Sequence, residues 1–153
     1  MKKQYEEIRK KHDLPSYEEL NKDFEIYSIS KEDDIIREIL KKMSNTIDFY
    51  INMLEDIIQP DSRFYTLKES NIVDKNLRIE VNKTYNKLMF LNRTNIELHL
   101  DYEEEKATQL IKNLFVEWQT IKKELIPVVK TLKESWLKNA EIKPERGYFG
   151  WLT

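Results

Sequence analysis

The 153-residue sequence contains no cysteine, and its two glycines, Gly147 and Gly150, both follow residue 146. Without cysteine the chain has no disulfide bond, thiolate zinc site or cysteine nucleophile. Without an earlier glycine it has no glycine-rich loop of the kind that holds phosphate groups in nucleotide-binding proteins. No apolar run approaches the roughly 20 residues of a membrane-spanning helix, and no apolar segment follows the basic N-terminus. These features predict a cytoplasmic protein that does not insert into a membrane.

Histidine is almost as scarce, since His12 and His99 are the only two. Neither belongs to a Glu-x-x-His motif, the pattern that builds di-iron sites in helical bundles. Neither lies next to a Gly-x-Ser-x-Gly turn, so no catalytic triad is indicated. We therefore expect no metal, no cofactor and no enzymatic activity. The alternative is an enzyme or metalloprotein whose site consists of residues that look ordinary in the sequence.

The residues that are present favour helix along almost the whole chain. Glycine is missing from the first 146 residues, and strictly alternating β-branched residues are missing as well. Charged residues make up 35% of the sequence and the hydrophobic set 40%, a balance that is too apolar for a disordered chain. The length fits a single domain over residues 1–153.

Residues 1–29 are expected to form short helices and a connector. A charged helix covers residues 2–11, and a second helix begins after Ser16, because Ser16 and Glu19 match a capping box. In this motif the serine oxygen accepts a hydrogen bond from the amide three residues later, and the glutamate accepts one from the serine amide. An extended connector is expected after Phe24.

The first long helix is predicted to begin after Ser30, with acidic residues in its first turn, and to end at Pro60. Its apolar residues recur at alternating steps of four and three, which is typical of a helix that packs in a bundle. This apolar stripe consists of Ile36, Leu40, Met43, Ile47, Tyr50, Leu54 and Ile57.

A connector with one helical turn is expected over residues 61–74, and two more long helices follow. The second should end near Leu100, because Asp101 and Glu104 match another capping box that starts the third helix. The predicted stripe of the second helix is Leu77, Val81, Tyr85, Leu88, Leu91 and Leu98. That of the third is Ala107, Ile111, Leu114, Trp118, Ile121, Leu125, Val128, Leu132 and Trp136.

Two asparagines, Asn92 and Asn95, lie near the stripe of the second long helix. A buried amide at such a position can fix the register of packed helices at some cost in stability. Exposure at a frayed helix end is the interpretation that the sequence favours.

The stripe of the third helix continues without a phase break across Pro127. Two separate helices would lose the phase at the break, so one helix is predicted over about residues 102–139. Proline removes one hydrogen bond and clashes with the carbonyl four residues earlier, so this helix should kink there. The predicted fold is therefore all-α: an antiparallel helical bundle of three long helices, with the short N-terminal helices as a further element.

Residues 143–153 form an aromatic C-terminal tail. Two glycines permit a tight return of the backbone in this segment, and a soluble chain rarely leaves several large apolar side chains in water. We expect the tail either to fold back on its own helices, which is the favoured outcome, or to bind a protein partner or a second subunit. The candidate partner-binding residues are Tyr148, Phe149, Trp151 and Leu152.

A polar surface of the second long helix is the candidate for binding nucleic acid. Basic and amide side chains recur there on neighbouring faces, with Glu80 as the one acid among them, and such side chains contact phosphate groups. The alternative is an ordinary solvated helix face that acidic residues 13–34 partly neutralise. The residues of this candidate surface are Lys75, Arg78, Asn82, Lys83, Asn86, Lys87 and Arg93.

The stretches HDLPSYEELNKDFEI and FVEWQTIKKEL, together with GYFGW near the end, give the chain an outline that resembles small all-helical archaeal proteins without an assigned function. The motifs concern packing and capping, so the resemblance implies a helical fold and no active-site residue.

The leading functional hypothesis is a non-catalytic protein-interaction module or a small assembly subunit, with a protein partner or self-association. The alternative is an RNA- or ribosome-associated protein that uses the face from Lys75 to Arg93.

Overall fold

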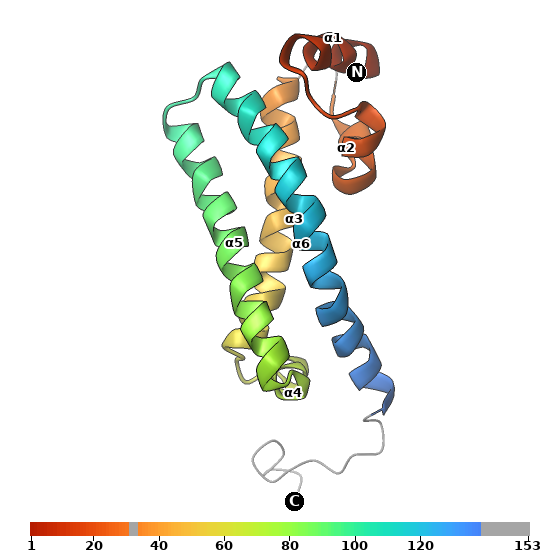
Figure 1. The fold of residues 1–153 in the computed structure, drawn as a ribbon, viewed down its shortest axis with the longest axis vertical. Coiled ribbons are helices and arrows are strands. Elements are labelled where there is room, and N and C mark those ends of the chain that lie inside the picture. Colours follow the sequence, from red (N-terminus) through yellow and green to blue (C-terminus); the bar gives the residue numbers. More distant parts are fainter. Residues whose placement is uncertain (31–33, 139–153) are drawn as a thin grey trace, which may run out of the picture. The chain divides into compact units, whose positions relative to one another are not determined.

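The computed structural model describes residues 1–30 and 34–138, and the described residues form helices and no strand (Figure 1). The all-helical prediction is therefore confirmed for this part of the chain. The elements are α1 (Lys2–His12), α2 (Tyr17–Phe24), the short 3-10 helix η1 (Ile26–Ser28), α3 (Ile35–Ile58), α4 (Phe64–Ile72), α5 (Lys75–Leu100) and α6 (Glu104–Lys138).

The chain divides into two compact units. The first unit comprises Met1–Tyr50 and Lys87–Thr120, and the second comprises Ile51–Asn86 and Ile121–Thr153. The three long helices α3, α5 and α6 each contribute one segment to each unit. The short helices α1 and α2 belong to the first unit, and α4 belongs to the second.

The N-terminal helices follow the expected capping chemistry. The Ser16 hydroxyl accepts a hydrogen bond from the Glu19 amide at 3.1 Å, and the Glu19 carboxylate accepts one from the Ser16 amide at 3.3 Å. The capping box is therefore confirmed. The Tyr5 side chain is fully buried and its hydroxyl donates to the Pro15 carbonyl, which ties α1 to the loop before α2. Burial raises the pKa of the Tyr5 hydroxyl, so it stays a neutral donor.

The connector after α2 is less extended than predicted, since Ile26–Ser28 form one turn of 3-10 helix. Glu25 precedes this turn with a φ of 54°, and its left-handed backbone ends α2 and redirects the chain. The Tyr27 amide donates to the Asn21 side chain at 2.9 Å. Ile26 and Ile29 are buried, so this segment is held against the first unit.

The predicted stripe of α3 is confirmed at six of its seven positions, which are buried, and Tyr50 is half-buried. Residues 31–33, which follow the predicted capping residue Ser30, lie outside the described residues. Helix α3 begins at Ile35, and the Asp34 carboxylate accepts a hydrogen bond from the Arg37 amide at 3.4 Å. Asp34 therefore caps the first turn of α3 as the structure describes it.

The stripe of α5 differs from the prediction at three positions, the first of which is Leu77, a half-buried residue. Thr84 is buried in place of Tyr85, and its hydroxyl donates to the Glu124 carboxylate at 2.8 Å. Asn95 is buried, which corrects the expectation of an exposed amide. Val81, Thr84, Leu88, Leu91, Asn95 and Leu98 thus form one stripe with steps of three and four.

Helix α6 is one continuous helix with Pro127 inside it, as the unbroken phase of its stripe predicted. It begins at Glu104, and the Glu103 carbonyl accepts the first helical hydrogen bond, from the Ala107 amide at 2.9 Å. Asp101 is therefore not the capping residue that the sequence indicated. The stripe is buried from Ala107 to Leu132, but Ser135 takes the next buried position and Trp136 stays 37% exposed.

The first unit has an aromatic cluster around Trp118. This ring lies 5.9 Å from Phe24 of α2 and 5.5 Å from Tyr50 of α3, measured between ring centroids. The Gln119 amide donates to the Asp23 carboxylate at 2.9 Å. Figure 1 shows α2 beside α6 in this unit, and the cluster supplies the contact that holds it there.

Replacement of Asn95 with leucine should stabilise the protein. The Asn95 amide oxygen is buried, and within the described residues it has no hydrogen-bond partner. Such a group costs about 1–3 kcal/mol, and leucine would continue the apolar stripe. We expect the free energy of unfolding, measured by urea denaturation, to rise by about 1 kcal/mol or more.

The matched control is Asn92→Leu, one turn earlier on α5. The Asn92 amide donates to the Asp48 carboxylate at 2.8 Å, so this variant should lose stability. A loss of stability in the Asn95 variant as well would contradict the interpretation of Asn95 as an unsatisfied buried group.

Candidate functional site

The predicted partner-binding residues Tyr148, Phe149, Trp151 and Leu152 lie outside the described residues. The predicted nucleic-acid surface of α5 is described, but it is divided between the units. Lys75, Arg78, Asn82, Lys83 and Asn86 belong to the second unit, and Lys87 and Arg93 belong to the first.

Arg78 connects the C-terminal ends of α3 and α4 from the first turn of α5. Its Nη1 donates to the Ile57 carbonyl at 3.0 Å, and its Nη2 donates to the Ser70 carbonyl at 2.6 Å. The Ser70 hydroxyl donates to the same Ile57 carbonyl at 2.7 Å. Carbonyls in the last turn of a helix have no N–H partner within the helix, and the helix dipole favours a cation there. Arg78 therefore has a structural role that the sequence pattern did not indicate.

The neighbouring polar residues on this part of α5 are exposed. The Asn82 amide donates to the Arg78 carbonyl one turn earlier, at 3.0 Å, and Lys83 forms an ion pair with Glu80 at 3.5 Å. Lys75 and Asn86 are exposed. These side chains are in contact with solvent because they are exposed. The exposed ion pair of Lys83 with Glu80 contributes little to stability.

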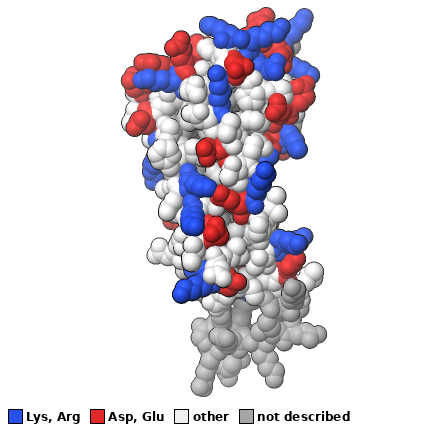
Figure 2. Space-filling view, in the orientation of Figure 1, with Lys and Arg blue, Asp and Glu red and all other residues white. Residues whose placement is uncertain are grey.

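In the first unit, Lys87 and Arg93 are exposed as well. The Arg93 guanidinium donates to the Asn92 side chain, which itself donates to Asp48. On the face shown in Figure 2, basic and acidic side chains are intermixed. A role of the α5 surface in nucleic-acid binding stays a prediction.

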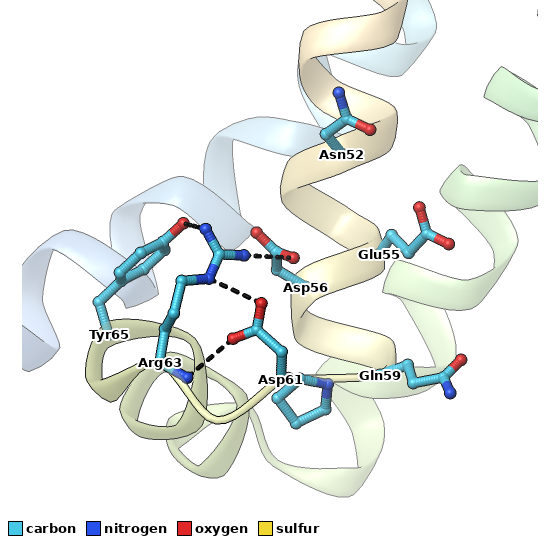
Figure 3. Close-up of a pocket in the computed structure, with 8 residues that line it drawn as sticks. Asn52, Glu55, Asp56, Gln59, Asp61, Arg63 and Tyr65 are labelled. Carbon is cyan, nitrogen blue, oxygen red and sulfur yellow. Dashed lines mark hydrogen bonds and ion pairs between the residues drawn. The ribbon is translucent and has the colours of Figure 1, made fainter.

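A polar pocket that the sequence did not indicate lies in the second unit, where the chain leaves α3 (Figure 3). Its cavity volume is about 740 Å³. Residues from the last two turns of α3, from the loop that follows and from the first turn of α4 line it. They are Asn52, Glu55, Asp56, Gln59, Pro60, Asp61, Arg63 and Tyr65.

Arg63 is the centre of this pocket. Its Nε lies 2.7 Å from the Asp61 carboxylate, its Nη2 lies 3.3 Å from Asp56, and its Nη1 donates to the Tyr65 hydroxyl at 2.7 Å. Figure 3 shows these side chains converging on the guanidinium. Two of the three carboxylates are thus paired, and the pocket contains no nucleophile with an adjacent base. The geometry fixes the loop after Pro60.

Asp61 organises the same loop through hydrogen bonds that its carboxylate accepts. Its carboxylate accepts from the Arg63 amide at 2.9 Å and from the Thr66 hydroxyl at 2.8 Å. The pKa of the Asp61 carboxyl is lowered, mainly by the hydrogen bond from the Arg63 amide and next by the hydrogen bond from the Thr66 hydroxyl. In the sequence, the only local sign of the Asp61–Arg63 turn is the pattern Asp-x-Arg. This pattern is too common to predict a turn.

Both histidines have polar partners within hydrogen-bonding distance. His12 Nε2 lies 3.2 Å from the Glu104 carboxylate, and its Nδ1 lies 3.4 Å from the Thr108 hydroxyl. His99 Nδ1 lies 2.7 Å from the Asn95 carbonyl, one turn earlier, as expected for a residue at a helix end. Residues 1–30 and 34–138 contain no cluster of three or more metal-ligating side chains. Within the same ranges, no helix combines the length and the apolar character that a bilayer crossing requires.

Large apolar side chains are exposed on the three long helices and on α4, and the stripe patterns did not identify them as surface residues. In the first unit they are Phe49, Phe90, Ile96, Leu100 and Val116. In the second unit they are Phe64, Tyr65, Ile79, Ile126, Val129, Trp136 and Leu137. Where such side chains gather into one apolar patch, the patch is a candidate interaction site.

Comparison of the chain with protein-family models, with curated proteins and with solved structures gave no match in any of the three. The resemblance to small archaeal helical proteins stays a prediction.

The Arg78→Ala variant should be clearly less stable than the wild type. It leaves the Ile57 and Ser70 carbonyls without their charged donor, and a hydrogen bond to a charged group contributes about 1.5–3 kcal/mol. We expect the free energy of unfolding in urea to fall by about 2–3 kcal/mol. Lys75→Ala is the control, because Lys75 is an exposed base in the same turn and its removal should change stability by about 0.5 kcal/mol or less. Equal effects of the two substitutions would refute a structural role of Arg78.

Low pH should loosen the loop around Asp61. A carboxyl whose pKa is lowered by folding stabilises the fold above its unfolded pKa, which is about 3.9 for aspartate. This contribution is lost as the pH falls through the folded pKa. We expect the amide resonances of Arg63 and Thr66 to shift together below about pH 4 in NMR titrations. In the Asp61→Asn variant this joint shift should be absent, and its persistence there would assign the transition to another group.

Proposed function

We propose that this protein is a non-catalytic protein-interaction module or a small assembly subunit. The observation that supports the proposal best is the exposure of large apolar side chains on the part of α5 that belongs to the first unit. Phe90 is 72% exposed and Leu100 is 84% exposed, although both lie on a helix whose opposite face is buried. A few well-packed residues near the centre of an interface carry most of the binding energy in protein complexes, and an exposed aromatic ring such as Phe90 can serve as such an anchor.

The exposed residues of α5 share one side of the helix. Phe90 and Leu100 are ten residues apart, which is close to three helical turns, and Ile96 lies beside them. Arg93 and Glu97 fall on the same side between them. Apolar anchors interspersed with charges of both signs are typical of a protein-binding surface, because the charges orient the partner while the apolar groups are desolvated.

The proposal rests on a finer description of the fold. We infer that α3, α5 and α6 pack as an antiparallel bundle, because each of them buries one stripe with steps of three and four. We also infer that α6 bends at Pro127, since proline removes a hydrogen bond inside this helix. In such a bundle the side of α5 that carries Phe90 and Leu100 is left for a partner.

Binding through this surface can be tested with the double variant Phe90→Asp and Leu100→Asp. Both side chains are exposed, so the fold should persist, as judged by circular dichroism. We expect wild-type protein either to self-associate in light scattering or to retain a partner in a pull-down. The double variant should lose that association, because two desolvated carboxylates are costly in an interface.

Arg93→Asp is the matched control, since it changes the net charge by the same two units and keeps the apolar side chains. It should weaken the association less than the double variant does. A strictly monomeric wild-type protein that retains no partner would disprove the proposed function. Stronger dependence on Arg93 than on Phe90 and Leu100, with a steep decline of binding in salt, would favour the nucleic-acid alternative.

A further inference from the structure

A second apolar face lies on α6, within the second unit. Ile126, Val129, Trp136 and Leu137 are all exposed, and Leu137 is exposed to 83%. Val129 is three residues after Ile126, and Trp136 and Leu137 are seven and eight residues after Val129. These spacings place the four residues on one side of the helix. The buried stripe of the same segment lies on another side and contains Leu125, Val128 and Leu132. The exposed side flanks this stripe, and Lys133 falls on it between Val129 and Leu137. Four large apolar side chains exposed beside a single lysine are still an interaction surface that needs a cover.

Helix α4 extends this apolar surface. The Phe64 ring lies 6.1 Å from the Trp136 ring, between centroids, and Phe64 is itself exposed. The Lys68 ammonium lies 4.3 Å from the Trp136 ring centroid, and the indole N–H donates to the Glu69 carboxylate at 2.9 Å. Trp136 is therefore fixed in place with part of its ring in solvent. We call the surface formed by Phe64, Ile126, Val129, Trp136 and Leu137 the α4–α6 face.

The sequence supplies a segment of matching chemistry directly after α6. Residues 139–153 follow Lys138, the last described residue and the neighbour of Leu137. They include Tyr148, Phe149, Trp151 and Leu152, four large apolar residues within five positions. Aromatic side chains provide the largest apolar area per residue that such a face could bury.

The length of the segment suits a return along α6. The face extends from Leu137 back to Ile126, eleven residues of helix and about 17 Å at about 1.5 Å per residue. Ten residues lead from Lys138 to Tyr148, and an extended chain of that length spans up to about 35 Å. Pro144 disfavours a helical continuation, and the two glycines allow a sharp change of direction.

We propose that residues 147–152 bind the α4–α6 face of their own chain. A segment held by a linker of about ten residues has an effective concentration in the millimolar range at the face. A second copy of the chain would need a comparable concentration in solution to compete for it. The segment then shields the apolar side of α6 from water, and the surface of α5 around Phe90 is left for other proteins. This inference does not depend on the proposed function, because it concerns a different surface and an occupant within the same chain.

Because the sequence contains no cysteine, Thr153→Cys introduces one unique position for a nitroxide spin label. NMR of the full-length, ¹⁵N-labelled, spin-labelled chain then reports which amides lie near the segment. We expect strong broadening of the amide signals of Phe64, Val129 and Leu137. In an equimolar mixture of ¹⁵N-labelled chain without the nitroxide and spin-labelled chain without ¹⁵N, these signals should stay sharp.

Two variants with the same substitution on α6 test the face itself. Val129→Asp, within the face, should abolish the broadening, whereas Val116→Asp, at a position 63% exposed in the first unit, should leave it intact. The double variant Phe149→Ser and Trp151→Ser should also abolish it without a change in the described helices. Broadening of the same signals in the mixed sample as well would assign the face to a second copy and overturn the proposal. Absence of broadening at the face in the wild-type sequence, or equal effects of the two valine substitutions, would overturn it as well.

Discussion

The second unit depends on the way Arg78 satisfies two helix ends at once. Helix α3 and helix α4 both end near the start of α5, and each leaves carbonyl groups without a helical partner. One guanidinium reaches the Ile57 and Ser70 carbonyls, and the Ser70 hydroxyl strengthens the junction by donating to Ile57. Because the Ile57 and Ser70 carbonyls have these donors, Ile57 and Val73 can be buried where α3, α4 and α5 meet. A lysine at this position could not serve both carbonyls as a planar fork does.

The apolar stripes were predictable because they depend only on spacing along one helix. The steps of four and three on α3 identified its buried residues, and the same rule carried the stripe of α6 across Pro127. The rule failed where a polar residue is buried through a partner on another helix. Thr84 is buried with a hydrogen bond to Glu124, forty residues away in the chain, and nothing in the local sequence of α5 indicates that partner.

The candidate sites show the same division between local and distant information. The basic pattern on α5 is visible in the sequence, yet the structural role of Arg78 requires the ends of α3 and α4. The polar pocket around Arg63 depends on Asp56, Asp61 and Tyr65, which come from a helix, a loop and the next helix. The apolar faces were missed for a different reason. Periodicity indicates that a residue is apolar and on a certain side, but whether that side is covered depends on which elements pack against it.

Trp118 and Trp136 lie on one helix but in different units and different surroundings. Trp118 is enclosed by Phe24 and Tyr50, whereas Trp136 is partly in water beneath the Lys68 ammonium. An indole shielded from water emits at shorter wavelength than an exposed one, so the two residues differ in fluorescence. Each unit consequently has its own optical reporter once Trp151 is replaced. Coincident or separate changes of the two signals during denaturation then show whether the units unfold as one cooperative body or in sequence.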